Sequence, residues 1–415
     1  MNLSPLLKLF SQIPAYNDFA QSLHPDPRSG PFGRPLGVLT AARPALIAAL
    51  QVDLRRPILL VSARADRAKI FAEQIQFWSS QPEAVCRLPD PDSLPHEKVP
   101  WGNETIQGRL SALSALVQYR QSRSAHQPSS TNHHPPANPS NSPPLQPSNP
   151  PIFQSAPLPP IIIASARGLM HQTLPPGKFT LQSFKVGQRV KLNEMLAQWV
   201  ALGYKPEEVV EVPGSFSRRG GILDVFPTNA PAPVRIELFG DEIDSLRLFD
   251  PASQRSDRRI KTFTLGPATE TLPGQADHVA NQLSRWDLSN LQPSTKLSFE
   301  EDITRLASTT IFRGIEYYLP FFYNGTDPQT SASNHASSLL DYLPDNTLVF
   351  VEDPSELAAV VDEVEVQART LKRDLIELGD LPGEWPDPYF SWSTLLPALL
   401  AQQPPVLGFS GFNGS

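Results

Sequence analysis

Three segments that lie far apart in the chain each join a short apolar run to a turn and a stretch with helical periodicity. They are PILLVSARADRAKIFAEQIQFW (Pro57–Trp78), IIIASARGLMHQ (Ile161–Gln172) and NTLVFVEDPSELAAVVDEV (Asn346–Val364). Unbroken Ile, Leu and Val runs are typical of strands buried on both faces, and strands that alternate with helices build parallel sheets. In the last segment, Asp353 followed by Pro354 favours a helix start. The chain is therefore predicted to contain a parallel α/β core.

Residues 205–260 break this rhythm, because they combine glycine turns with a strict two-residue alternation of apolar and polar side chains. In VRIELF, alternation sends Val234, Ile236 and Leu238 to one face of a strand. Gly240-Asp241-Glu242 is typical of a tight turn, and SLRLF is the predicted return strand, with Leu246 and Leu248 on the apolar face. The sequence thus predicts an antiparallel sheet, inserted into or appended to the α/β core.

The other face of this hairpin is predicted to carry Arg235, Glu237 and Phe239 on the first strand, with Ser245, Arg247 and Phe249 on the second. An aromatic side chain displayed among arginines is typical of a protein interface. One alternative remains open, which is that a neighbouring domain covers this face. A second concerns the Arg218-Arg219-Gly220-Gly221 stretch, which also fits a solvated turn with Arg219 paired to Asp224.

Length and composition narrow the classes of function. The 415 residues allow two to four domains, and the net charge of −7 gives no general attraction to DNA or to anionic membranes. The single cysteine, Cys86, excludes a disulfide framework, and no Cys/His group has zinc-ligand spacing. Neither a signal peptide nor an apolar run long enough to span a membrane is evident, so we expect the cytoplasm.

Residues 121–160 have a different composition, with 12 prolines, 8 serines and only Arg123 charged. Such a segment buries too little apolar surface to offset the entropy of ordering. We expect a disordered insertion in a surface loop, with a polyproline ligand site as the alternative. Its histidines, His126, His133 and His134, are not expected to bind a metal ion without a rigid frame.

The α/β core raises the question of nucleotide binding. Phe32–Leu50 contains Gly37 followed by VLTAARPA, which lacks the second glycine, the lysine and the Ser/Thr of a phosphate-binding loop. Gly177-Lys178 lacks the leading glycine, and no catalytic motif stands out elsewhere. We therefore expect no catalytic residues, no cofactor and no metal site, and interpret the chain as a binding module.

The segment SRRGGILDVFPTNAPAPVRIELFGDEIDSLRLFDPASQRS (Ser217–Ser256) resembles the UvrB-homology module of the bacterial transcription-repair coupling factors. Four more stretches follow the order of that family: Leu88–Leu116, Lys185–Tyr204, Gly314–Tyr323 and Leu343–Leu357. The resemblance covers roughly residues 25–395 and is interrupted by the Pro/Ser-rich insertion. UvrB shares parts of the motif, but this chain has a degenerate phosphate loop and lacks the Tyr-rich hairpin of UvrB between Leu88 and Arg109.

The resemblance implies a fold and a division of the chain. The fold is α/β, with a degenerate helicase-like parallel core (UvrB-like domains 1A and 1B) and an antiparallel, β-rich α+β domain 2. Domain 1A is expected over residues 25–183 with the insertion at 121–160, domain 2 over 184–268, and domain 1B over 269–400.

The resemblance also implies a partner, UvrA, which the family recruits to stalled RNA polymerase in nucleotide excision repair. By position, its contact residues are Arg219, Arg235 and Phe239, with Glu237 and Arg247 beside them on the same face. In the family a C-terminal domain masks this surface, and RNA polymerase, DNA, ATP and Mg²⁺ are bound by parts beyond this chain. We expect a monomeric, non-catalytic module. The alternatives are a UvrB-like ATP-dependent DNA-damage enzyme and an α/β domain with an unrelated small ligand.

Overall fold

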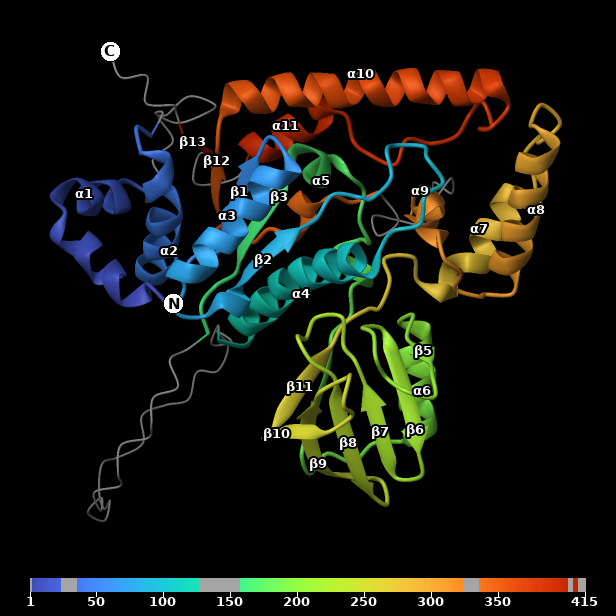
Figure 1. The fold of residues 1–415 in the computed structure, drawn as a ribbon, viewed down its shortest axis with the longest axis horizontal. Coiled ribbons are helices and arrows are strands. Elements are labelled where there is room, and N and C mark those ends of the chain that lie inside the picture. Colours follow the sequence, from blue (N-terminus) through green and yellow to red (C-terminus); the bar gives the residue numbers. More distant parts are fainter. Residues whose placement is uncertain (1, 24–35, 127–156, 324–335, 402–405, 410–415) are drawn as a thin grey trace, which may run out of the picture.

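The computed structural model describes residues 2–23, 36–126, 157–323, 336–401 and 406–409. Figure 1 shows two sheets on opposite sides of the long helix α4 (Asn103–His126). One sheet is enclosed by helices, and the other stands at the end of the molecule away from helix α10 (Pro354–Leu378).

The first sheet is parallel and has five strands in the order β13-β12-β1-β3-β2. Its strands are β1 (Ile58–Ser62), β2 (Val85–Leu88), β3 (Ile161–Ser165), β12 (Leu348–Val351) and β13 (Leu407–Gly408). The central strands are buried along their whole length, as their unbroken apolar runs predict. The expected parallel α/β core is thus confirmed.

Helices cover both faces of this sheet. Successive residues of a strand point to opposite faces, so each central strand packs against helices on both sides. Ile58, Leu60 and Phe350 pack with α2 (Arg43–Leu54) and α3 (Ala65–Trp78). Leu59 and Val351 pack with α4 and α10 on the other side. Helix α1 (Pro14–Ser22) packs on the same side as α2. The other helices of this part of the molecule are α5 (Ala166–Met170), α7 (Ala276–Leu283), α8 (Pro293–Ala307), α9 (Leu319–Tyr323) and α11 (Trp392–Leu400). Short 3-10 helices span Ser4–Gln12, Thr40–Ala42, Pro82–Ala84, Pro176–Lys178, Pro273–Gln275, Ile315–Tyr318 and Leu339–Tyr342.

The start of α10 follows from its sequence. The Asp353 carboxylate accepts hydrogen bonds from the backbone N–H groups of Ser355 and Glu356, both at 3.0 Å, and Pro354 takes the first helical position. These contacts satisfy N–H groups that have no partner inside the helix, so the predicted N-cap is confirmed.

Two observations bear on the expected organisation of the chain. Strand β12 lies within the residues expected as domain 1B, yet it pairs with β1, so it completes the sheet of the expected domain 1A. Residues 121–126 of the expected disordered insertion belong to helix α4, and Leu158, Pro159 and Pro160 at its other end are buried. The first proline of the segment is Pro128, so nothing before it breaks the helix. The rest of the insertion, 127–156, lies outside the described residues, and the domain boundaries stay a prediction.

The second sheet has six strands in the order β10-β9-β8-β7-β6-β5, antiparallel except for the short β5–β6 pair. Its strands are β5 (Lys205–Pro206), β6 (Ser215–Arg219), β7 (Ile222–Val225), β8 (Val234–Phe239), β9 (Glu242–Phe249) and β10 (Ser256–Ile260). One face packs on α6 (Leu192–Ala201) and on the two-stranded sheet of β4 (Gln182–Lys185) and β11 (Thr262–Leu265). Trp199 and Ile236, both fully buried, are part of this core. The expected β-rich α+β unit is therefore present.

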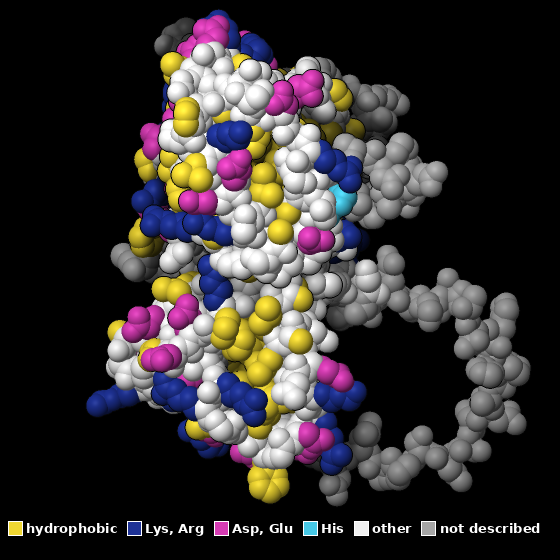
Figure 2. Space-filling view, turned by 90° about the vertical axis from the view of Figure 1, so that its right-hand side faces the viewer, with side chains coloured by type: hydrophobic (Ala, Val, Ile, Leu, Met, Phe, Trp, Pro, Cys, Tyr) yellow, Lys and Arg dark blue, Asp and Glu magenta, His cyan; other side chains and the backbone are white. Residues whose placement is uncertain are grey.

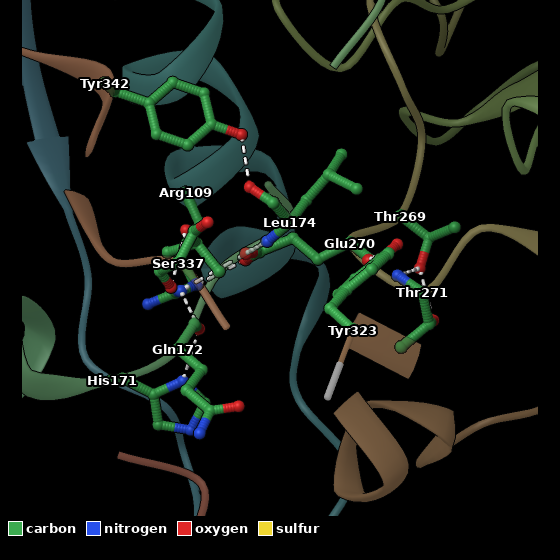
Figure 3. A network of polar contacts seen from close by, with 11 residues as sticks. Arg109, His171, Gln172, Leu174, Thr269, Glu270, Thr271, Tyr323, Ser337 and Tyr342 are labelled. Atoms are coloured by element: carbon green, nitrogen blue, oxygen red, sulfur yellow. Dashed lines mark hydrogen bonds and ion pairs between the residues drawn. The ribbon is translucent and has the colours of Figure 1, made fainter. Parts of the chain in front are cut away.

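A buried ion pair lies where this unit meets the α/β core (Figure 3). Arg109 of α4 donates from Nε to Oε1 of Glu270 at 2.5 Å, and both side chains are almost fully buried. Glu270 also accepts from the backbone N–H of Leu174 at 3.1 Å. In addition, the Ser111 hydroxyl of α4 donates to the carbonyl of Thr228 at 2.9 Å. These contacts hold the segment after β11 and the loop between β7 and β8 against α4.

Within the described residues, no helix combines the length and the apolar character needed to cross a membrane.

Candidate protein-binding face

The β8–β9 hairpin forms around the predicted glycine turn. Phe239 and Glu242 are the last paired residues, which leaves Gly240 and Asp241 as the turn. Gly240 has a φ of 66°, a conformation that costs glycine little. Gly220 has a similar φ of 61° in the turn between β6 and β7. Both turns lie at the same end of the sheet, away from α4 (Figure 1).

The predicted alternation along β8 is confirmed. Val234 and Ile236 are buried in the unit's core, whereas Arg235 and Glu237 are partly exposed on the other face, here called the outer face. Phe239 follows them on the outer face and is 83% exposed. Asp244 is the extra residue of a β-bulge, because Leu238 pairs with Ile243 and Glu237 with Ser245. The bulge keeps Ile243 in the core and Ser245 on the outer face.

Arg235 is held in place by a buried carboxylate. It donates from Nε and Nη2 to the two oxygens of Asp224 at 2.7 and 2.8 Å, and Asp224 is only 3% exposed. Its guanidinium also lies 4.8 Å from the centre of the Phe249 ring. The hydrogen bond with Asp224 raises the pKa of Arg235 above its ordinary value, so the group stays charged. Because Asp224 bonds to Arg235, the alternative Arg219–Asp224 pair is not formed, and Arg219 donates to the carbonyl of Glu208 at 2.7 Å instead.

Glu237 and Arg247 form a second, looser pair on the outer face. Arg247 Nη2 lies 3.4 Å from Glu237 Oε2, and the Ser245 hydroxyl donates to the same oxygen at 2.5 Å. Both charged side chains remain about one-third exposed. They are thus accessible to a partner.

Phe249 was predicted to be exposed on the outer face, but the structure buries it. It is 1% exposed and packs with Val210 and Phe226, which come from the chain before β6 and after β7. The residues that cover Phe249 belong to the same β-rich unit and not to a neighbouring domain. At the Phe239 end, the described residues leave the aromatic ring exposed.

Two more side chains share the outer face and were not predicted from the sequence. Ile222 pairs with Glu237 and is 40% exposed, and Arg259 of β10 pairs with Arg247. For Ile222 the alternation in GGILDVF was an available signal. Arg259 gave no clear signal, because β10 has a register shift between Ser256 and Arg259.

A second region that could carry chemistry is the turn before α2, where a phosphate loop would lie. Arg43 is buried there, donates from Nη1 to the carbonyl of Glu352 at 3.4 Å, and lies 5.0 Å from the Phe409 ring centre. The Glu352 carboxylate is paired with Arg67. The chain's own carbonyl and aromatic groups therefore contact Arg43 at this turn, and the nearby Glu352 carboxylate is neutralised by Arg67. Among the described residues, no three His, Cys, Asp or Glu side chains are grouped to hold a metal ion.

Comparison with known proteins matches the second sheet to one family model. The model described as UvrB interaction domain covers residues 183–270, a range that spans all strands from β5 to β11. Transcription-repair-coupling factors are similar over larger parts of the chain. That of Mycobacterium tuberculosis is 29% identical in an alignment that covers 99% of this chain and 29% of the relative.

Two other relatives give the same picture. The transcription-repair-coupling factor of Bacillus subtilis is 29% identical over 54% of this chain, and that of Escherichia coli is 26% identical over 81%. These matches cover 19% and 25% of the two relatives, so the chain spans less than a third of the length of each of these curated proteins. The chain is therefore similar along nearly its whole length to the N-terminal, UvrB-like part of transcription-repair-coupling factors, and residues 183–270 match the UvrB interaction domain.

Proposed function

We propose that this chain is a non-catalytic module that binds UvrA through the outer face of the β8–β9 hairpin. In this way it would serve transcription-coupled nucleotide excision repair. The observation that carries the proposal is the position of Phe239, which is 83% exposed beside the turn of a well-paired hairpin. Around it on the same face lie the charged side chains of Arg219, Arg235, Glu237 and Arg247.

An exposed aromatic ring is costly to leave in water and gains free energy when a partner covers it. Arginine is enriched with aromatic residues at the centres of protein interfaces, because its planar group binds carboxylates through two hydrogen bonds. Arg235 is already ordered by Asp224, so little side-chain entropy is lost when a partner binds it. The face therefore combines an apolar anchor with preorganised charge.

The same reasoning favours a protein partner over a catalytic role. A UvrB-like ATP-dependent enzyme needs a phosphate cradle, and the turn before α2 has no lysine or second glycine and holds the buried Arg43. On the side of the molecule shown in Figure 2, positive and negative side chains are interspersed rather than gathered into a large field of one sign. RNA polymerase and DNA would be contacted by other parts of a longer coupling factor, and we expect the module itself to be a monomer.

Calorimetric titration of the purified chain with UvrA from the same organism tests the proposal. We expect saturable binding without added ATP or DNA, and no phosphate release from ATP beyond the buffer rate. Absence of UvrA binding at micromolar concentrations would contradict the binding role. ATP hydrolysis by the chain would favour the enzyme alternative.

A further inference from the structure

Three arginines lie side by side on the outer face. Strand pairing places Arg235 of β8 directly opposite Arg247 of β9, and Arg247 directly opposite Arg259 of β10. Directly paired residues point to the same side of a sheet, so these three side chains form one row across three strands. We call this row the arginine row.

Charge along the arginine row is compensated at only two of its three positions. Arg235 is bonded to Asp224, and Arg247 is paired with Glu237. Arg259 is exposed at the edge strand, and none of the described carboxylates lies within ion-pair distance of it. Like charges placed directly opposite each other across strands destabilise a sheet. The arrangement is thus unfavourable in isolation and becomes favourable when an acidic group binds beside it.

We propose that Arg259 extends the partner-binding face onto β10 and binds a carboxylate on an acidic patch of the partner protein. The inference rests on the proposed function and adds a residue and a strand to that site. The partner surface that fits has a recess for Phe239 and acidic side chains opposite the arginine row. Strands β8, β9 and β10 are adjacent, so one partner surface can contact all three at the same time.

A nucleic acid fits this face less well than an acidic protein. Glu237 lies between the arginine row and Phe239 on β8, where it interrupts the run of positive charge that a continuous phosphate backbone would need. Basic side chains on an edge strand can also serve only to prevent pairing with other sheets. In that case Arg259 would contribute nothing to the affinity for the partner.

The test compares Arg259→Glu with Arg258→Glu in the full chain, using UvrA as the titrant. Arg258 is an exposed arginine one residue earlier, and it lies where β10 shifts its register with β9, so it is a matched control for charge and strand. We expect Arg259→Glu to weaken UvrA binding about tenfold, and Arg258→Glu to change it less than about twofold. The difference should shrink at high salt, because exposed charge pairs are screened.

Equal affinities of the two variants for UvrA would overturn the inference, as would a loss of duplex DNA binding with unchanged UvrA binding. Melting temperatures within about 2 °C of each other would show that folding does not explain a difference. The variant Phe239→Ala distinguishes a failure of the inference about Arg259 from a failure of the proposed function. If Phe239→Ala loses UvrA binding and Arg259→Glu keeps it, only the role proposed for Arg259 is wrong. If Phe239→Ala binds UvrA like wild type, the proposal that the outer face binds UvrA is wrong.

Discussion

Asp224 and Arg235 face each other across β7 and β8 and are joined by two hydrogen bonds of 2.7 and 2.8 Å. The carboxylate is buried and the guanidinium is partly exposed. The pair thus has two roles, since it stabilises the sheet and presents a fixed arginine on the outer face. Binding and stability are therefore coupled at Arg235, and a substitution there is expected to change both.

Arg235→Lys keeps the charge but loses the two-point contact with Asp224. We expect UvrA affinity to fall about tenfold and the free energy of unfolding to fall by about 1–2 kcal/mol, because the buried carboxylate keeps only one bond. Calorimetry and denaturant unfolding measure the two effects. Arg247→Lys is the control, with a stability change below about 0.5 kcal/mol, because its pair with Glu237 is longer and exposed. Equal stability losses in both variants would refute the role given to Asp224.

The Arg109–Glu270 pair gives a prediction about the junction. Arg109→Met should cost about 3–5 kcal/mol of stability, because it leaves the Glu270 carboxylate buried without its partner. The double variant Arg109→Met/Glu270→Gln should regain part of this loss, since it buries no unpaired charge and the glutamine oxygen can still accept from Leu174. Denaturant unfolding of the single and double variants measures the difference. A double variant less stable than Arg109→Met would contradict the account.

Local patterns in the sequence predicted the elements and the outward side of β8. Alternation with a period of two depends only on neighbouring residues, so the exposed position of Phe239 and the buried position of Ile236 could be predicted without the fold. The same holds for the N-cap at Asp353. The identity of the UvrA contact residues is still a prediction.

Features that depend on distant residues could not be predicted. Phe249 has the alternation of an outer-face residue, but chain from before β6 and after β7 covers it, and no local pattern reports that packing. Arg109 and Glu270 are separated by 161 positions, and either could have been a surface charge. The sequence pattern placed β12 in a parallel core, but an unbroken apolar run does not identify its neighbour, so the pairing with β1 could not be predicted.

Glu316 predicts a dependence of stability on pH. Burial raises the pKa of its carboxyl from 4.5 to about 7, and its Oε2 has no hydrogen-bond partner among the described residues. Between pH 4.5 and 7 the folded state holds a proton that the unfolded state releases, so the wild-type protein loses stability as the pH rises through this range. Glu316→Gln lacks this loss and should gain about 1–3 kcal/mol relative to wild type between pH 5 and pH 8. Thermal unfolding at both pH values measures it.

Glu300→Gln is the control for this experiment, because Glu300 is exposed on α8. Its melting temperature at each pH gives the baseline effect of replacing an exposed glutamate by glutamine. A Glu316→Gln difference that is the same at pH 5 and pH 8 would show that the carboxyl titrates normally.

The turn before α2 predicts the response to nucleotide. With Arg43 buried there and Glu352 paired to Arg67, 1 mM ATP with Mg²⁺ should shift the melting temperature by less than about 1 °C. A nucleotide with a Kd of about 10 μM would add about 2.7 kcal/mol of stability at that concentration, which is readily measured. A saturable rise in melting temperature would therefore demonstrate a nucleotide site.

Phe239→Ala, measured for UvrA affinity and melting temperature beside the core variant Ile236→Ala, tests the central claim most directly. Phe239 is 83% exposed and Ile236 is fully buried three residues away on the same strand. Phe239→Ala should weaken UvrA binding by about 2 kcal/mol or more with a stability change below about 0.5 kcal/mol, while Ile236→Ala should cost about 2–5 kcal/mol of stability and leave binding per folded molecule intact. Wild-type affinity in folded Phe239→Ala would contradict the claim and place the UvrA contact elsewhere.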